Sequence, residues 1–586
     1  MRRMKFSGRC ESEVRPVPKQ TIYTITANCQ DCYRCVRECP VKAIRISGGQ
    51  ARIEDNLCIK CGTCVRECPQ HAKTVRSDLD EARLLFTENR VVAASVAPSF
   101  AAMFTGTLVS RLPSALRRLG FQFVGETAEG AKYVAEKSFM PPQTGSICTA
   151  CPAVVNYVEK YQPDYTDALI PVVSPMVAHS RMIKEKHPGC AVIFIGPCAA
   201  KKQEIQKPGN AGIVDVVLTF TELLEWFSSE NIQLEDCSES GFDQIYEIGD
   251  ARLFPIQGGM LKTAGIVSDG TQADVLHISG AEDVIGLFSG HPDLEGKLIE
   301  PLFCSGGCIG GPCFGSDESP ADGKNLFARR ESIIRYAAQS KKKGGIAPLP
   351  LIIRHNTEFI PDKQKQVKVS ENQINKILEQ TGKINPVHQL NCGACGYKSC
   401  LENAIAVARG MAEPEMCIPY MRRLAQQRTD QIIETTPNGI VILDSELYMI
   451  KMNPAFQKIF MCNNGILGRR ISYLVNAEGF ERLQSGSVDK YESVQTKYGI
   501  KYHEILYSLR EEKQYVGIYS DISKIKFDTG QLDTVKAQTL MHAREFLDHQ
   551  VRFAQEMAHY LGKSTAQSEE IAKRLISLYE EDSGET

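Results

Sequence analysis

The sequence CQDCYRCVRECP at residues 29–40 returns almost unchanged as CIKCGTCVRECP at residues 58–69. Both stretches place four cysteines at the spacing C-x2-C-x2-C-x3-C and follow the last one with proline. A pattern repeated at this short interval indicates that the region is built from two similar halves. We therefore expect residues 1–80 to fold as one module with an internal duplication.

This spacing is typical of ferredoxin-type modules, in which the fourth cysteine of each run binds the cluster of the other run. The first predicted 4Fe-4S cluster is held by Cys29, Cys32, Cys35 and Cys68, called the first ferredoxin-type set. The second is held by Cys58, Cys61, Cys64 and Cys39, called the second ferredoxin-type set. Two zinc sites are the alternative, because four thiolates also bind zinc. The duplication and the proline after each fourth cysteine favour iron and sulfur.

Length and composition set the class of protein. A chain of 586 residues exceeds what one hydrophobic core usually supports, so we expect several domains. A formal net charge of −2 gives no basic excess for binding nucleic acid. The start, MRRMKFSGRC, has no apolar run behind it, and no apolar stretch is long enough to span a bilayer. We therefore expect a cytoplasmic protein without membrane contact, whose 22 cysteines bind metal more often than they form disulfides.

Four further cysteines lie in three separate segments. Cys151 is in ICTACP, Cys198 follows the apolar run AVIFI in GPCAAKKQE, and Cys304 and Cys308 are in EPLFCSGGCIGG. Spacing alone does not assign these thiols, because a single cysteine is usually a buried small hydrophobe. Together with their neighbours, the three segments resemble the active-site segments of the iron-only (FeFe) hydrogenases. The resemblance covers about residues 20 to 335.

The resemblance implies a domain of two α/β lobes, expected over residues 81–345, with an H-cluster between them. That cofactor is a 4Fe-4S cube joined through a cysteine to a di-iron unit with carbonyl and cyanide ligands. Carried over residue by residue, the cube ligands are Cys151, Cys198, Cys304 and Cys308, called the hydrogenase-like set, with Cys308 as the bridge. Lys201 matches the lysine that donates to an iron-bound cyanide. The neighbouring Lys202 is expected at the surface.

The runs AVIFI, VDVVLTF and ADVLHI predict strands of this domain independently of any resemblance. Helices are expected after the last two, from near Thr221 and near Ser279.

The chain also departs from the hydrogenase pattern. Ala150 stands where catalytic members have a proton-relaying cysteine, and a methyl group cannot carry a proton. Glu126 and Glu129 match the two relay glutamates and are expected on one helical face, whereas Ile170 falls on the relay serine. Two methionines of the family correspond to Gly196 and Leu302. Because loss of a positioned acid-base group costs about 10² to 10⁴-fold in rate, we expect slow hydrogen chemistry.

A third cysteine pattern, NCGACGYKSC followed by PEMC, resembles the small 4Fe-4S domain of membrane redox and corrinoid proteins. It is expected over residues 376–426, after a linker region at 346–375. Its predicted ligands are Cys392, Cys395, Cys400 and Cys417, called the 392–417 set. Zinc is the alternative metal here as well. The run LENAIAVARGMA between them is predicted to be helical.

Residues 427–528 resemble a PAS sensor domain. The run ILDSELYMIKMN predicts a hairpin, Asn453 to Phe456 begin a helix, and KYHEILYSL and QYVGIYSDI predict further antiparallel strands. Cys462 and His503 are expected to be packing residues. Residues 529–586 predict a helical signalling tail, whose His549 and His559 are not followed by an ATP-binding domain.

The predicted fold is therefore multidomain, with α/β and α+β parts, and two functions compete. One is a sensory protein that slowly oxidises H2 or reduces protons at an H-cluster and signals through the PAS domain and the tail. The other is a catalytic, ferredoxin-dependent FeFe hydrogenase. Ala150, the PAS-like region and the helical tail favour the sensor, with low hydrogenase activity. A relative of cytosolic iron-sulfur assembly factors, holding only ordinary cubes, is less favoured because Lys201 and Cys308 are retained.

The expected partners follow from this reading. They are H2 and protons, a redox partner such as ferredoxin, and a downstream signalling protein. The PAS domain or the tail could also form a homodimer.

Overall fold

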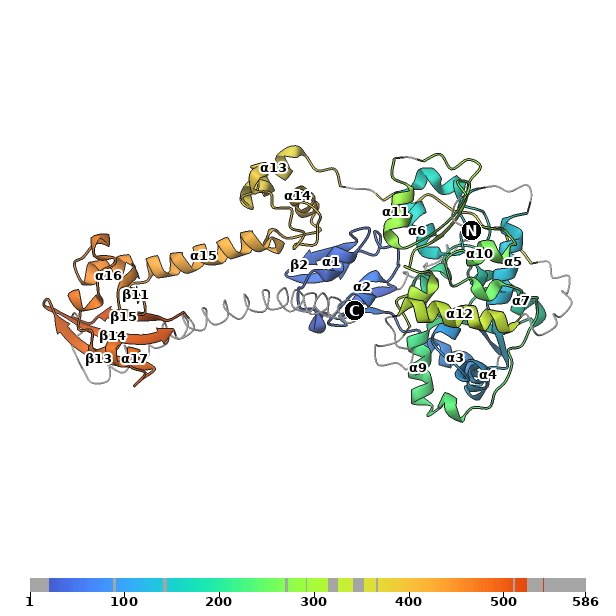
Figure 1. Ribbon diagram of the computed structural model, residues 1–586, viewed down its shortest axis with the longest axis horizontal. Coiled ribbons are helices and arrows are strands. Elements are labelled where there is room, and N and C mark those ends of the chain that lie inside the picture. Colours follow the sequence, from blue (N-terminus) through green and yellow to red (C-terminus); the bar gives the residue numbers. More distant parts are fainter. Residues whose placement is uncertain are drawn as a thin grey trace, which may run out of the picture. The chain divides into compact units, whose positions relative to one another are not determined.

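The computed structural model describes residues 20–87, 91–140, 145–268, 272–290, 292–314, 325–340, 353–364, 367–509 and 512–523, together with Met541. Contacts divide the chain into two compact units, Met1–Met416 and Cys417–Thr586. Figure 1 shows the elements of both units, coloured along the sequence. The helical tail expected over 529–586, with His549 and His559, lies outside the described residues apart from Met541.

The amino-terminal module has the two similar halves that its duplicated sequence predicts. In each half a cysteine loop runs into a short helix through a residue with positive φ, Tyr33 at 54° and Gly62 at 77°. Strand β1 pairs antiparallel with β4, and β2 pairs with β3. The elements are β1 (Ile22–Thr24), α1 (Arg34–Glu38), β2 (Ile44–Ser47), β3 (Gln50–Ile53), α2 (Thr63–Arg66) and β4 (Lys73–Val75).

The larger α/β lobe is built on a four-stranded parallel sheet in the order β6-β5-β7-β8. Every residue of these strands is buried, because hydrophobic clusters cover both faces of the sheet. The predicted runs AVIFI and VDVVLTF form β7 and β8. The strands are β5 (Val92–Val96), β6 (Phe123–Glu126), β7 (Ala191–Gly196) and β8 (Val216–Thr219). The helices are α3 (Leu79–Thr87), α4 (Leu108–Arg118), α5 (Ala128–Ser138), α7 (Pro175–Lys186), α8 (Ala200–Glu204), α9 (Phe220–Ser229) and α12 (Leu326–Ser340).

The smaller lobe contains a two-stranded parallel sheet of β9 and β10. The predicted run ADVLHI and the helix after it are β9 and α11. Ile147 forms isolated bridges to Leu169 and Ile299, which tie the segment before Cys151 to this lobe. The elements are α6 (Pro152–Tyr161), α10 (Gly259–Thr263), β9 (Val275–Ser279), α11 (Ala281–Leu287) and β10 (Leu298–Leu302).

Residues 353–364 lie within the region 346–375 that the sequence predicts as a linker, but they pack on the larger lobe. The amide of Val173 donates to the carbonyl of His355 at 2.9 Å. Ile353 is buried in the cluster that contains strand β7's Phe194. An apolar anchor and backbone hydrogen bonds therefore hold this stretch as a strap on the domain.

The segment that carries the third cysteine pattern packs on the ferredoxin-type module. The amide of Ile46 donates to the carbonyl of Met411 at 3.0 Å, and the amide of Gly48 donates to the Glu413 carboxylate at 2.6 Å. Met416 is fully buried in the module's hydrophobic cluster. The predicted helix is present, and the helices are α13 (Glu371–Gln380) and α14 (Cys400–Ala408).

The second unit is a five-stranded antiparallel sheet in the order β12-β11-β15-β14-β13, preceded by a long helix. The predicted hairpin, the helix at Asn453 and the two later strands are all present. The Asn453 side chain accepts from the amides of Phe456 at 2.9 Å and Ile440 at 2.7 Å, which joins the helix start to the sheet. The elements are α15 (Ile418–Thr435), β11 (Gly439–Leu443), β12 (Met449–Met452), α16 (Pro454–Ile459), α17 (Glu478–Gln484), β13 (Lys490–Lys497), β14 (Ile500–Leu509) and β15 (Gln514–Asp521).

Two of the predicted domain boundaries fall inside helices. Residue 81 lies in α3, whose Leu79 and Ala82 belong to the core of the larger lobe. Residue 427 lies in α15, which begins directly after Cys417. A cysteine motif does not predict where such helices begin, because the motif lies in a loop and gives no information on the element that follows it. Within the described ranges, no helix is both long and apolar enough to cross a bilayer.

Candidate iron-sulfur and hydrogenase-like site

The first ferredoxin-type set is assembled from both cysteine runs. Burial raises the pKa of the Cys35 thiol to about 11, and the neighbouring thiols of Cys32, Cys29 and Cys68 act in the same direction. Cys68 belongs to the second run, yet its thiol lies near thiols of the first run. The side chains are therefore arranged with the fourth cysteine exchanged between the runs, as the spacing predicts. Ligation of a cluster by these thiols stays a prediction.

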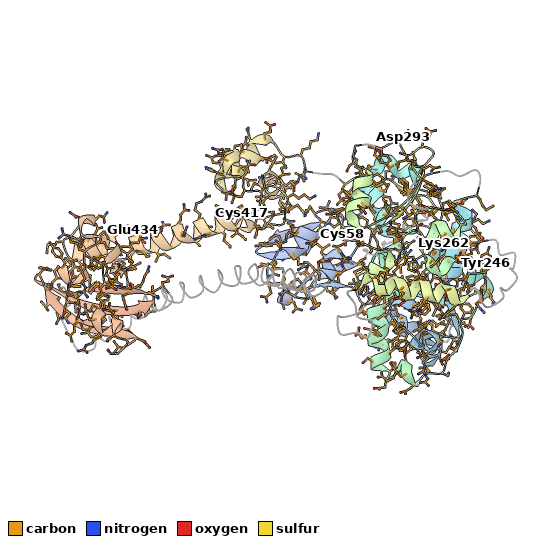
Figure 2. The ribbon with its side chains drawn as sticks, viewed as in Figure 1. Cys58, Tyr246, Lys262, Asp293, Cys417 and Glu434 are labelled. Carbon is orange, nitrogen blue, oxygen red and sulfur yellow. The ribbon has the colours of Figure 1, made fainter. Side chains whose placement is uncertain are left out.

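The second ferredoxin-type set mirrors the first. Burial raises the pKa of Cys39 to about 12, with the thiols of Cys61 and Cys58 adding to the rise. The thiol of Cys64 has Cys61, Cys39, Cys58 and also Cys35 as electrostatic neighbours. Because Cys35 belongs to the first set, the two sets adjoin. Figure 2 labels Cys58 within this module.

The hydrogenase-like set converges from distant segments. Cys151 is the N-cap of α6, Cys198 follows β7, and Cys308 opens a short 3-10 helix at Cys308–Gly310. Burial raises the pKa of Cys304, and the thiols of Cys198, Cys151 and Cys308 act in the same direction. The lobes therefore bring all four predicted ligands together.

The chemistry of these buried thiols fits an iron-sulfur group. Burial raises the pKa of Cys198 to about 11 and also raises the pKa of Cys308, so neither thiol ionises readily by itself. A bound metal supplies the positive charge that keeps a buried thiolate ionised. Across the described part of the chain, no three His, Cys, Asp or Glu side chains lie close enough to bind one metal ion.

The second ferredoxin-type set packs directly on the hydrogenase-like set. A Cβ at Gly62, whose φ is 77°, would lie 2.3 Å from the Pro312 ring, so only glycine allows this approach. Arg66 donates from Nη1 to the carbonyl of Gly310 at 3.2 Å. Cys61 is among the thiols that raise the pKa of Cys304, after burial. A redox group in one set would therefore adjoin a redox group in the other.

Lys201 lies beside the hydrogenase-like set. Its positive charge opposes the burial-driven rise in the pKa of both Cys198 and Cys308. Its Nζ donates to the Glu204 carboxylate at 2.7 Å, with each side chain 9% exposed. Glu204 belongs to the same GPCAAKKQE segment as Cys198 and Lys201, and the motif alone gives it no role. In the structure it orients the lysine on the helix that follows Cys198.

Lys202 is a correction to the sequence analysis, which expected a surface lysine. Its side chain is fully buried and donates to Asp78 at 2.9 Å, to Glu222 at 3.0 Å and to the carbonyl of Val217 at 2.8 Å. The partners are 124 and 20 residues away in the sequence. The prediction was wrong because a lysine pair carries no signal of such distant acidic partners.

The two predicted relay glutamates do not share a helical face, which is a second correction. Glu126 is the last residue of β6, whereas Glu129 lies in the first turn of α5. The Glu126 carboxylate pairs with Arg252 and accepts from the Tyr336 hydroxyl at 2.8 Å. A spacing of three suggested a helix, but the strand continues to Glu126. The ion pair holds this carboxylate in place.

Glu129 is buried in a different environment. Burial raises the pKa of its carboxyl to about 8, although the amide of Ile245 donates to Oε2 at 2.7 Å. The amide of Tyr246, which Figure 2 labels, donates to the same oxygen. The other oxygen lies 3.9 Å from Nε2 of His179, whose pKa burial lowers to about 3. Glu129 therefore keeps its proton at neutral pH, next to a neutral imidazole.

The 392–417 set lies on a loop and two helix starts. Cys392 is exposed, and Cys395 is half-buried. Cys400 begins α14, and its amide donates to Asn391 at 2.8 Å. Cys417 follows Met416 in the chain and is the N-cap of α15, the first helix of the second unit (Figure 2).

Three segments of the chain match known families. Residues 90–312 match the family described as iron only hydrogenase large subunit, C-terminal domain. Residues 21–81 match the 4Fe-4S dicluster domain, and residues 389–419 match the FeS family of Fe-S cluster segments. The chain is a hydrogenase-like iron-sulfur protein.

Individual relatives match only parts of this hydrogenase-like protein. The cytosolic Fe-S cluster assembly factor NAR1 of Vanderwaltozyma polyspora is 37% identical over 87 residues, which are 15% of this chain and only 17% of the relative. A solved FeFe hydrogenase HydA1 from Chlamydomonas reinhardtii aligns over 49% of this chain and 100% of its own, at 16% identity and a TM-score of 0.36. A PAS domain from an HTR-like protein of Haloarcula marismortui aligns over 17% of this chain and 97% of its own, at 25% identity and a TM-score of 0.15.

The departures from the hydrogenase pattern have structural reasons of their own. Ala150 packs beside the core of the larger lobe. The side chain of Ile170 is buried, and its carbonyl accepts from the Thr149 hydroxyl at 3.1 Å. A Cβ at Gly196 would lie 2.8 Å from the Phe194 ring, so a methionine there would require repacking. Leu302, at the other methionine position, is likewise buried.

Glu300, the first residue of the EPLFCSGGCIGG segment, has a role that the sequence does not indicate. Burial raises the pKa of its carboxyl to about 7, and the amides of Met260 and Leu261 donate to it at 3.2 and 3.1 Å. Its negative charge adds to the rise in the pKa of the Cys148 and Cys308 thiols, which burial mainly causes. A buried acid next to a predicted ligand was not recognisable from sequence, because only the fold brings the backbone amides to it.

Proposed function

We propose that the protein senses hydrogen: it binds H2 and oxidises it slowly, or reduces protons, at an H-cluster in the hydrogenase-like set. The observation that carries this proposal is the convergence of Cys151, Cys198, Cys304 and Cys308 next to the Lys201 ammonium. When bound there, a di-iron unit bridged through Cys308 would supply the chemistry of splitting hydrogen. Lys201 would donate to its cyanide, which is a charge-assisted contact.

Slow turnover follows from the proton-carrying groups of the chain itself. Ala150 has a methyl group where a thiol would exchange a proton, and Ile170 has only a hydrocarbon side chain. Glu126 is engaged by Arg252 and Tyr336, so it is not free to accept and release protons. Glu129 holds a proton, but it faces the amides of Ile245 and Tyr246. Among the described residues, these four positions therefore do not form a continuous relay of acid-base groups.

Electrons would enter and leave through the ferredoxin-type module, because its second set adjoins the hydrogenase-like set through Cys61 and Gly62. A separate redox protein such as ferredoxin would exchange electrons with this module. The predicted cofactors are then two 4Fe-4S clusters in the module, the H-cluster, and one further 4Fe-4S cluster at the 392–417 set.

The second unit would be the output domain. Its strand order and the Asn453 cap that begins α16 are those expected of a PAS domain. We propose that it passes the redox state to a downstream signalling protein, either directly or as a homodimer. A state change at the clusters can bias this unit only if its two conformations interact with them differently.

Two alternative functions compete with hydrogen sensing. The first is a catalytic, ferredoxin-dependent hydrogenase, which the retained Lys201 favours. The second is a role in iron-sulfur assembly, suggested by the name of the fungal relative. An assembly factor with ordinary cubes would have no use for the Cys308 bridge or for Lys201.

Infrared spectroscopy of anaerobically matured protein distinguishes these functions. A sensor or a hydrogenase should show carbonyl and cyanide bands, and an assembly factor should show none. Hydrogen–deuterium exchange of residues 417–523 under H2 and under oxidant then tests signalling. The double variant Cys395→Ser, Cys400→Ser should lose that response and keep the infrared bands. Identical exchange under H2 and under oxidant, with all clusters loaded, would overturn the sensor proposal.

A further inference from the structure

The loop at residues 392–397 is clamped to the ferredoxin-type module by two basic side chains. Lys42 Nζ donates to the carbonyl of Gly396 at 2.9 Å and to two carbonyls of α1 at 2.8 and 2.9 Å. Arg37 donates to the carbonyl of Ala394 at 3.0 Å. One lysine thus satisfies carbonyls of both partners at once. The contact between the loop and the module therefore depends on directed hydrogen bonds as well as on apolar packing.

Gly396 is required for this close approach. Its φ is 91°, and a Cβ there would lie 2.8 Å from Cγ1 of Val36. Both the backbone conformation and the space therefore exclude other residues. The close approach to Val36 shows that glycine at this position serves the docking on α1.

Tyr397 lies at the centre of the contact. Its side chain is 5% exposed and belongs to the same cluster of buried residues as Cys35 and Cys39. The thiols of Cys395 and Cys39 are its electrostatic neighbours. Its hydroxyl has no hydrogen-bond partner among the described residues. A buried hydroxyl normally has an acceptor, and the sulfurs of an iron-sulfur group are acceptors.

We propose that Tyr397 links the 392–417 set to the second ferredoxin-type set for electron transfer. In this link, its ring lies between Cys395 and Cys39, and its hydroxyl donates to a sulfur of the cluster held by one of these two sets. The transfer between the two sets moves one electron, oxidising one group and reducing the other, and no bond is made or broken. The electron comes from H2, which gives two protons and two electrons, or from a chemical reductant. Only the first source rests on the proposed function.

The second ferredoxin-type set becomes a branch point in this arrangement. Cys61 adjoins the hydrogenase-like set, Cys64 adjoins Cys35 of the first set, and Cys39 adjoins Tyr397. Electrons arriving from the hydrogenase-like set can therefore pass either to the first set or to the 392–417 set. The first leads outward to a redox partner, and the second leads to the segment that precedes the second unit.

Tyr397→Phe tests the hydroxyl while keeping the ring. The full chain with loaded clusters is titrated with dithionite and mediators, and each cluster is followed by electron paramagnetic resonance. Loss of a donor destabilises the more negative, reduced form, so one midpoint potential should fall. We expect about a tenfold change in the reduction equilibrium, which is about 59 mV for a one-electron couple. Tyr23→Phe, at an exposed tyrosine of β1, is the matched control and should shift nothing.

Gly396→Val tests the docking independently of the hydroxyl. With iron content unchanged, it should abolish the magnetic interaction between the reduced clusters at the 392–417 set and the second set. Unchanged potentials in Tyr397→Phe, or a persistent magnetic interaction in Gly396→Val, would overturn the inference. Because both measurements use dithionite, they can succeed in a protein that fails to respond to H2, and they can fail in one that responds.

Discussion

The ferredoxin-type module and the hydrogenase-like domain each gather cysteines, but they do so by different means. In the module, two short runs of sequence supply all eight thiols, and loops that end in α1 and α2 fix their positions. In the hydrogenase-like domain, the thiols follow β7, precede α6 and open a 3-10 helix. The first arrangement depends on local backbone geometry. The second depends on how two lobes pack, so distant substitutions should affect it more.

The strongest test of this contrast is Cys308→Ser. The variant should abolish the carbonyl and cyanide infrared bands completely, because Cys308 is the predicted bridge to the di-iron unit. The ferredoxin-type clusters should stay reducible by dithionite, since their thiols come from other segments. Bands that persist would remove Cys308 as the bridge. Loss of the ferredoxin-type signals would show that the two regions are not independent.

Lys202→Met should destabilise the hydrogenase-like domain by about 3–5 kcal/mol, because it leaves the buried Glu222 carboxylate without its cation and leaves Asp78 with Arg76 alone. The free energy of unfolding in urea measures the effect. The control is Arg335→Met, whose side chain and whose partner Glu331 are both exposed, and it should cost about 1 kcal/mol or less. Equal effects of the two substitutions would contradict the distinction between a packing-dependent and a surface ion pair.

Ala150→Cys restores a proton-exchanging group next to a predicted ligand. Hydrogen evolution, measured by gas chromatography with reduced mediator, should rise, by at most about 10²-fold. The gain should be smaller than for a complete relay, because Ile170 still has no exchangeable proton and Glu126 is engaged by Arg252. The infrared bands report whether loading has changed. A fast wild-type enzyme would contradict slow turnover outright.

Burial of Glu129 should make the stability of the folded chain depend on pH. The pKa of Glu129 is raised from 4.5 to about 8 by burial, so the folded state binds more protons than the unfolded state between these values. Stability from this group is therefore present below about pH 4.5 and falls as pH rises toward 8, by at most about 1.4 kcal/mol per pH unit.

Glu129→Gln removes this dependence. Urea unfolding at pH 5, 6, 7 and 8 should show the variant gaining stability relative to the wild type as pH rises. A difference that does not vary with pH would mean that Glu129 is ionised in the folded protein.

Local patterns and distant contacts were predictable to different degrees. The strands AVIFI, VDVVLTF and ADVLHI, the helix start at Asn453 and the grouping of the eight module cysteines all follow from residues close in sequence. The burial of Lys202 and the ion pair of Glu126 with Arg252 do not. Each depends on a partner from another element, and a single sequence carries no record of which charges meet.

The sequence by itself determined that this is an iron-sulfur protein with a duplicated module and hydrogenase-like segments, because thiolate spacing and apolar runs are local properties. Only the tertiary structure decided that Glu126 ends a strand, that residues 353–364 form a strap, and that Tyr397 is buried near Cys395 and Cys39. The reason is that burial and electrostatic neighbours arise when elements pack. A residue's chemistry is set by its own side chain, whereas its role is set by what the fold places around it.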